Sequence, residues 1–221
     1  MARLALATAL TLALAAPALA LPLQEPVPPP EPQPVIAYRQ STPVGVWWAG
    51  KLRRGVQLPA EGPDWFTWDP VRKRVPNRGW RRWGTDRLLR TVLEVIAEYR
   101  MDNALAPRVG IGDLSRRHGG NFGMRFGGLG HGSHQNGLDA DIYYPRMDGL
   151  ERRPYKPAQV DRELAQDLVD RFVAAGARTI YVGPSLSLKG PRKVVEPLVH
   201  HDDHLHVRLD LRPLARPTWR G

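Results

Sequence analysis

The sequence of this protein contains no cysteine, which excludes disulfide bonds, thiolate metal ligands and a cysteine nucleophile. Any metal ion that it binds must therefore be held by imidazole nitrogens and carboxylate oxygens. Beyond its first 20 residues the sequence has no apolar run of the roughly 20 residues that a membrane-spanning helix needs. The glycine-rich stretch at 119–132 lacks the Gly-Lys-Ser/Thr of a phosphate-binding loop, so we interpret it as a flexible loop without a nucleotide site.

Residues 1–20 predict a secretory signal peptide. Arg3 precedes an apolar run at 4–16, and Ala18-Leu19-Ala20 has the small-x-small pattern that signal peptidase recognises. An uncleaved amphipathic anchor is the alternative, and the absence of cysteine after the cleavage site excludes a lipoprotein. We therefore expect an exported protein of the periplasm, cell wall or extracellular space, with no stable membrane insertion after signal cleavage.

Composition predicts two further parts of the chain. Residues 21–40 are rich in proline and predict an extended, disordered linker, and residues 41–221 predict one folded domain. The net charge of +10 favours attraction to an acidic polymer such as nucleic acid or an anionic cell wall. The arginines do not form a dense stripe and no nucleic-acid-binding motif accompanies them, so a solvated basic surface is as good an explanation and we expect no nucleic-acid partner.

The periodicity of the folded part predicts an α+β domain, with a small, mainly antiparallel sheet flanked by helices. Thr85 and Asp86 offer an N-cap to a helical apolar pattern that continues to Tyr99, and a second helix is expected at 158–175, before Gly176. Strands are expected at 109–111, 138–143, 179–182 and 205–211. Six of the seven tryptophans lie at 45–83, among irregular loops and short strands. We interpret them as buried packing residues, and a glycan-binding groove is the alternative.

Six of the seven histidines fall in two short clusters. The clusters contain His131 and His134, followed by Asp139 and Asp141, and then His200, His201, His204 and His206. Because side chains alternate along a strand, both strands should have one apolar face, with Asp139 and Asp141 on the opposite face of the first and His204, His206 and Arg208 on that of the second. Gly137 permits a sharp turn that brings His134 onto the face of Asp141.

Imidazole and carboxylate side chains together suit zinc, and three protein ligands with an open fourth position make a catalytic site. His134, Asp141 and one of His204 or His206 would complete such a set, on one face of the sheet. The alternative is a polar sheet face whose histidines only form hydrogen bonds. The clustering of six histidines on strands of matching period favours the metal site.

The segment from Ser133 to Asp141, together with His204-Leu-His206, resembles the His-(six residues)-Asp and His-x-His signature of a zinc peptidase superfamily. That superfamily includes lysostaphin, the D-alanyl-D-alanine metallopeptidases and the hedgehog signalling domain. Within it the sequence is most similar to the penicillin-insensitive murein endopeptidases, whose pattern has further histidines that match His131 and His201. Pro76-Asn-Arg-Gly-Trp80 and the His-Val-Arg-Leu at 206–209 also match, so the resemblance runs from about residue 45 to 209.

The resemblance implies that His134, Asp141 and His206 hold Zn²⁺, that His204 is the general base, and that His131 and His201 are additional active-site histidines. It implies a zinc metallo-endopeptidase, a hydrolase that cuts the D-alanyl peptide crosslinks between peptidoglycan (murein) stem peptides with a zinc-activated water. A D-alanine carboxypeptidase, a wall amidase of the same superfamily and a non-catalytic, zinc-stabilised wall-binding module are the alternatives. The absence of a histidine between His134 and His200 leaves the binding of a second metal open, and the oligomeric state is not predicted.

Overall fold

The computed structural model describes residues 34–126 and 130–211. The predicted signal peptide at 1–20 and most of the predicted linker at 21–40 lie outside the described residues. No helix in the described ranges has both the length and the apolar character needed to cross a membrane.

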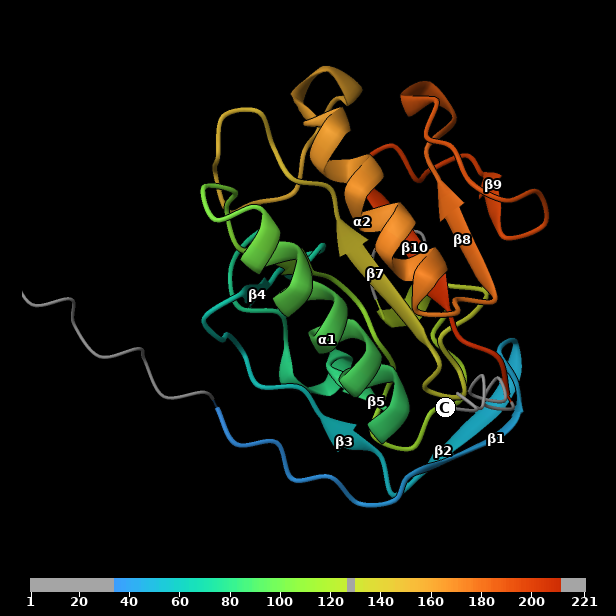
Figure 1. Cartoon of the computed structure of the whole chain (residues 1–221). Coiled ribbons are helices and arrows are strands. Elements are labelled where there is room, and N and C mark those ends of the chain that lie inside the picture. Colours follow the sequence, from blue (N-terminus) through green and yellow to red (C-terminus); the bar gives the residue numbers. More distant parts are fainter. Residues whose placement is uncertain (1–33, 127–129, 212–221) are drawn as a thin grey trace, which may run out of the picture. The chain divides into compact units, whose positions relative to one another are not determined.

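A six-stranded sheet forms the centre of the described domain (Figure 1). Its inner pairings, from β6 through β7 and β10 to β8, are antiparallel, and the outer strands β4 and β9 each pair in parallel. The mixed fold with a mostly antiparallel sheet therefore agrees with the prediction. In spatial order the strands are β4 (Trp65–Thr67), β6 (Val109–Ile111), β7 (Asp139–Tyr143), β10 (His204–Arg208), β8 (Thr179–Val182) and β9 (Val195–Pro197).

Two helices, α1 (Asp86–Asp102) and α2 (Arg162–Ala174), contact each other and lie side by side in front of the sheet in Figure 1. Each begins where a side chain accepts a hydrogen bond from a first-turn amide: Thr85 from Leu88 N, and Asp161 from Leu164 N. Their apolar stripes join one buried cluster with the apolar face of the central strands. Because the helices cover that face, the polar side chains of the central strands point to the opposite one.

The second helix begins later than residue 158, the start predicted from the sequence. Pro157–Gln159 forms a separate 3₁₀ turn, and Val160 is extended, so the capping carboxylate of Asp161 sets the start of α2. Gly176 follows α2 at a φ of +80°, as expected for a residue that ends a helix. The last predicted strand is shorter than expected, since β10 ends at Arg208 opposite the first residue of β7, Asp139.

Two small antiparallel ribbons and three further 3₁₀ turns complete the described elements. The ribbons pair β1 (Thr42–Val46) with β2 (Ala49–Arg53) and β3 (Val56–Gln57) with β5 (Trp83–Gly84), and the turns are Gly79–Arg81, Met124–Phe126 and Pro184–Leu186. The prediction of short strands and loops at 45–83 is confirmed. The tryptophans of this segment differ in burial. Trp65 and Trp68 are buried, whereas Trp48 is 53% exposed.

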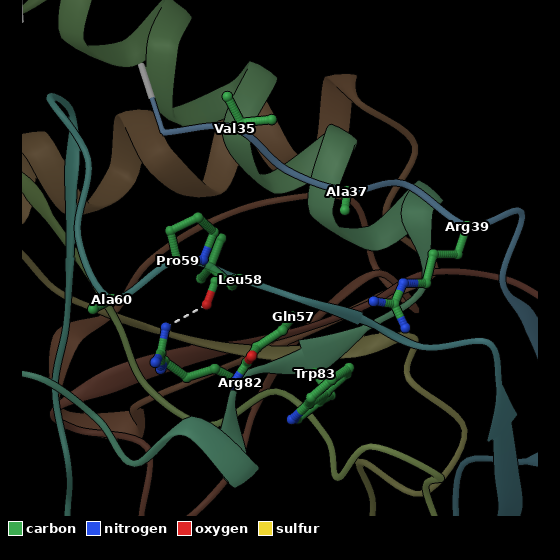
Figure 2. A pocket seen from close by; sticks show the side chains of 9 residues that line it. All are labelled: Val35, Ala37, Arg39, Gln57, Leu58, Pro59, Ala60, Arg82 and Trp83. Atoms are coloured by element: carbon green, nitrogen blue, oxygen red, sulfur yellow. Dashed lines mark hydrogen bonds between the residues drawn. The ribbon is translucent and has the colours of Figure 1, made fainter. Parts of the chain in front are cut away.

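The segment at 34–41 packs beside α1. Ile36 and Tyr38 pack against the apolar core, and the Asp86 carboxylate accepts hydrogen bonds from the amides of Arg39 and Ser41. The packed part of the chain therefore begins before residue 41. An open pocket of about 330 Å³ lies between this segment and the β3–β5 ribbon, and Figure 2 shows Arg82 donating to the Leu58 carbonyl beside it. No residue of the two histidine clusters lines this pocket.

Candidate active site

The antiparallel register of β7 and β10 brings the two histidine clusters together. His206 pairs with Asp141, and Arg208 pairs with Asp139, on the face of the sheet that the helices do not cover. His206 Nδ1 lies 3.0 Å from Asp141 Oδ1, and its Nε2 lies 2.9 Å from Asp139 Oδ1. The predicted alternation of apolar and polar faces on these two strands is therefore confirmed.

His134 reaches the same carboxylate from the loop that precedes β7. Gly137 takes a φ of +77°, and a Cβ there would lie 2.9 Å from Leu52 side-chain atoms, so both backbone and space favour glycine. His134 itself has a φ of +66°, an unfavourable value for a residue with a side chain. Its Nε2 lies 3.3 Å from Asp141 Oδ1. His134, His206 and Asp141 thus meet at one carboxylate oxygen.

The hydrogen bonds around these two imidazoles fit a cation. His134 Nδ1 bonds to the Leu114 carbonyl, which makes Nδ1 the donor and leaves Nε2 as a lone-pair nitrogen. That Nε2 is buried and has no hydrogen-bond partner in the described structure. His206 Nδ1 lies toward the same Asp141 oxygen, while its Nε2 contacts Asp139 Oδ1 and Arg208 Nη2. Two imidazole nitrogens and one carboxylate oxygen that meet in this way are a donor set suited to a metal ion.

The electrostatics of the cluster also favour a bound cation. Burial would raise the pKa of the Asp141 carboxyl, but the imidazoles of His134 and His204 hold it well below its ordinary value. Burial would lower the pKa of His206, but Asp139 and Asp141 together raise it. The site therefore keeps its carboxylates ionised and attracts positive charge.

A second group of possible ligands overlaps the first. One nitrogen each of His131 and His134 and an oxygen of Asp141 lie within 4.8 Å of one another, close enough to hold a metal ion. His131 Nε2 is 3.8 Å from Asp141 Oδ2 but only 2.8 Å from Asp113 Oδ2. The cluster could hold a metal ion, and His131 and His206 are the two alternatives for its third ligand.

His131 is fixed by a buried network that the sequence did not predict. Asp113, which is 1% exposed, accepts hydrogen bonds from Arg81 through both its oxygens, and Asn77 Nδ2 donates to it at 3.0 Å. Desolvation would raise the pKa of Asp113, but Arg81 and His131 bring it well below its ordinary value. Asn77 belongs to the Pro-Asn-Arg segment that contributed to the resemblance, whereas Asp113 is recognisable in the sequence only as a carboxylate that follows a predicted strand.

His204 lies at the start of β10, beside the cluster. Its Nδ1 is 2.7 Å from Asp203 Oδ1, and its Nε2 is 3.7 Å from Asp141 Oδ1. Burial would lower the pKa of His204, but Asp141 and Asp203 raise it. Asp203 is held in turn by Arg153, at 2.8 Å. Asp203 was not identified from the sequence, although it directly precedes His204.

His201 lies at the edge of the same group. Its ring centroid is 4.7 Å from that of His204 and 6.1 Å from that of His206, and its Nδ1 is 2.9 Å from the Val199 carbonyl oxygen. Burial, with the neighbouring His204, lowers the pKa of His201 to about 4. The structure thus brings together all six residues singled out from the sequence: His131, His134, Asp141, His201, His204 and His206.

Sequence comparison identifies the family of this site. The family of penicillin-insensitive murein endopeptidases matches residues 43–180, which include His131, His134 and Asp141 and make up more than half of the chain. No curated protein shows significant similarity to the chain. The match and the assembled cluster lead to one conclusion: the chain belongs to the penicillin-insensitive murein endopeptidase family and is a hydrolase of the peptidoglycan-cleaving type.

Proposed function

We propose that this protein is a zinc endopeptidase that hydrolyses the D-alanyl peptide crosslinks of peptidoglycan, and that His134, Asp141 and His206 hold the zinc. The observation that carries the proposal is the convergence of imidazole nitrogens of His134 and His206 on the Asp141 carboxylate, in a chain of this family. Imidazole and carboxylate ligands with an open position are typical of catalytic zinc. When bound there, zinc supplies a Lewis acid that acidifies water and polarises a carbonyl.

His204 is the proposed general base. Because its Nδ1 donates to Asp203, the basic lone pair is on Nε2, which faces Asp141. In this role Nε2 takes the proton of the attacking water and then delivers it to the departing amine of the cleaved amide. Asp203 positions the ring and stabilises its protonated form, and Arg153 holds Asp203.

His131 and His201 flank the cluster on its two sides. Asp113 fixes His131 through Nε2, and we assign His131 to the stabilisation of the oxyanion that develops on the scissile carbonyl. The low pKa of His201 keeps this imidazole neutral at the pH of the cell envelope, so it can contact the substrate as an uncharged hydrogen-bonding group. No serine or cysteine nucleophile takes part in this mechanism, so we expect that β-lactams, which acylate an active-site serine, do not inhibit the enzyme.

Location follows from the substrate. Peptidoglycan lies outside the cytoplasmic membrane, so the proposed substrate requires export, and residues 1–20 are the proposed export signal. The proposed domain organisation is this signal, a linker and the peptidase domain.

The test is the digestion of crosslinked peptidoglycan by the purified mature protein, followed by mass analysis of the products. Conversion of crosslinked dimers to monomers, abolished by a chelator and restored by zinc, is the expected result. Release of free D-alanine without loss of dimers would identify a carboxypeptidase, and release of peptides from sugars would identify an amidase. Stoichiometric zinc without any cleavage would overturn the enzymatic proposal in favour of a wall-binding module.

A further inference from the structure

The hairpin formed by β1 and β2 has an unusual turn. Val46 pairs with Ala49, so only Trp47 and Trp48 connect the two strands. Two-residue hairpin turns favour asparagine, aspartate or glycine with positive φ, and neither tryptophan adopts a positive φ. The turn geometry does not require two indoles at this exposed position, and departures from local preference are expected at functional or strained sites.

The hairpin is hydrogen-bonded to the loop that contains His134. Gln135 N donates to the Trp47 carbonyl at 3.2 Å, and Asn136 Nδ2 lies 3.4 Å from the Gly45 carbonyl oxygen. Both donors directly follow His134 in the sequence. The turn is therefore held in place relative to the candidate active site by two hydrogen bonds.

A chain of side-chain contacts links the turn to the cluster on the sheet. The Arg208 guanidinium carbon lies 4.1 Å from the centroid of the Trp47 ring, and Arg208 Nε lies 2.6 Å from Asp139 Oδ1. That same oxygen bonds to His206 Nε2. Arg208 Nη2 also lies 3.2 Å from His206 Nε2, so Arg208 contacts both the Trp47 ring and a proposed zinc ligand.

Trp48 packs against Trp47 at the turn. Its ring centroid is 4.4 Å from that of Trp47 at an interplanar angle of 71°, an edge-to-face contact that restricts its orientation. The Arg208 guanidinium lies over the Trp47 ring, whereas Trp48 is 53% exposed. The result is an exposed, flat apolar surface with a polar N–H edge, next to the Trp47 ring that contacts Arg208.

We propose that Trp48 is a stacking platform for a sugar ring of the glycan strand to which the cleaved stem peptide is attached. The inference rests on the proposed function, because the attached glycan is what would bring sugars next to this cluster. The apolar C–H face of a pyranose matches an indole in size and polarity, and its hydroxyl groups remain in water. The indole pair at the turn therefore extends substrate recognition from the peptide to the glycan.

The charge of the hairpin agrees with such a substrate. Lys51, Arg53 and Arg54, on β2 and just after it, line an open pocket of about 650 Å³. None of the three forms an ion pair within the described ranges 34–126 and 130–211. Stem peptides carry free carboxylates, so a strand that passes over this hairpin would meet cationic side chains.

The experiment compares two substrates that share the same crosslinked peptide. One is a muropeptide dimer with its sugars, and the other is the dimer after an amidase has removed them. Trp48→Ala should lower kcat/KM on the sugar-bearing dimer by about tenfold, mainly through KM, and should keep the wild-type rate on the sugar-free dimer. Trp48→Phe should recover most of the loss, because it restores an aromatic face. Leu105→Ala, at a fully exposed residue on the loop after α1, is the control for loss of exposed apolar area.

An equal loss on both substrates, or a loss on neither, would overturn the inference. A direct binding titration separates this result from a failure of the proposed function. Glycan strands freed of all stem peptides should bind the wild-type protein and change its tryptophan fluorescence, and they should bind Trp48→Ala at least several-fold more weakly. If the wild type cleaves neither dimer, the proposed function fails and this titration alone decides: absence of binding, or equal binding by both proteins, overturns the sugar platform.

Discussion

Asp203 Oδ1 lies 2.7 Å from His204 Nδ1, and this pairing leaves Nε2 of His204 as the nitrogen that faces Asp141. A histidine held in this way has a fixed tautomer and a base directed into the site. The proposed roles of base and metal ligand fall on two histidines of one short strand, because His206 contacts the carboxylates of both Asp139 and Asp141. We therefore expect that substitution of one histidine removes one proposed role and leaves the other.

Removal of the base should leave metal binding intact. We expect His204→Ala to retain stoichiometric zinc and to lower kcat by about 10²- to 10⁴-fold, since general base catalysis contributes about that much. Asp203→Asn should lower kcat by a smaller factor, about 10- to 100-fold, because the ring remains but loses its positioning carboxylate. Metal content and steady-state kinetics measure both effects. Near-native turnover by His204→Ala would show that another group is the base.

The third metal ligand is either His206 or His131, and substitution of each histidine distinguishes these two ligand sets. With His206 as the ligand, His206→Ala should lower zinc affinity by more than about 100-fold, whereas His131→Ala should keep the metal and lose turnover. His200→Asn removes an exposed imidazole of the second cluster that has no proposed role, and asparagine tolerates the positive φ of this position. This variant is the control and should change neither property. Loss of zinc from His131→Ala, with retention by His206→Ala, would favour the set of His131, His134 and Asp141.

The buried pair of Arg81 and Asp113 should matter for stability as well as for His131. Arg81→Ala leaves a buried carboxylate without its main partner, and we expect about 3–5 kcal/mol of destabilisation in urea unfolding. Asp102→Ala breaks the exposed pair with Arg171 and should cost less than about 1 kcal/mol. If the two variants unfolded at similar urea concentrations, the network around Asp113 would have no special structural role.

Gly137 should be sensitive to substitution, because it lies shortly before β7 and its turn positions His134. Gly137→Ala combines a strained φ with a contact to Leu52 at 2.9 Å, and we expect a loss of more than about 1–2 kcal/mol with weaker zinc binding, because His134 would shift. Gly149→Ala has a similar positive φ but no atom within 4 Å, so it measures the backbone strain alone. Equal destabilisation of the two variants, with unchanged zinc affinity, would show that the Leu52 contact does not position the loop.

Some elements of the structure could be predicted because they depend on sequence patterns within a few residues of each other. The cap at Thr85, the strand at 109–111 and the alternation around Asp141 and His206 follow from hydrogen-bonding groups and side-chain periods that lie close together in the sequence. The start of α2 was misplaced by periodicity, since Val160 fits the apolar stripe of a helix although its backbone is extended. Burial of the tryptophans was predicted as a group, and exposure of Trp48 at a turn is a property of one hairpin that composition does not reveal.

The sequence by itself determined the residue types of the site and the faces on which they lie, because strand alternation and the two histidine clusters are local features. Only the tertiary structure decided which groups meet. The register of β7 and β10 placed His206 opposite Asp141, and the folding of distant loops brought Asp113, Arg81 and the Trp47–Trp48 turn beside them. These contacts join residues far apart in the chain, so they depend on the pairing of strands and the packing of loops, which no local pattern encodes.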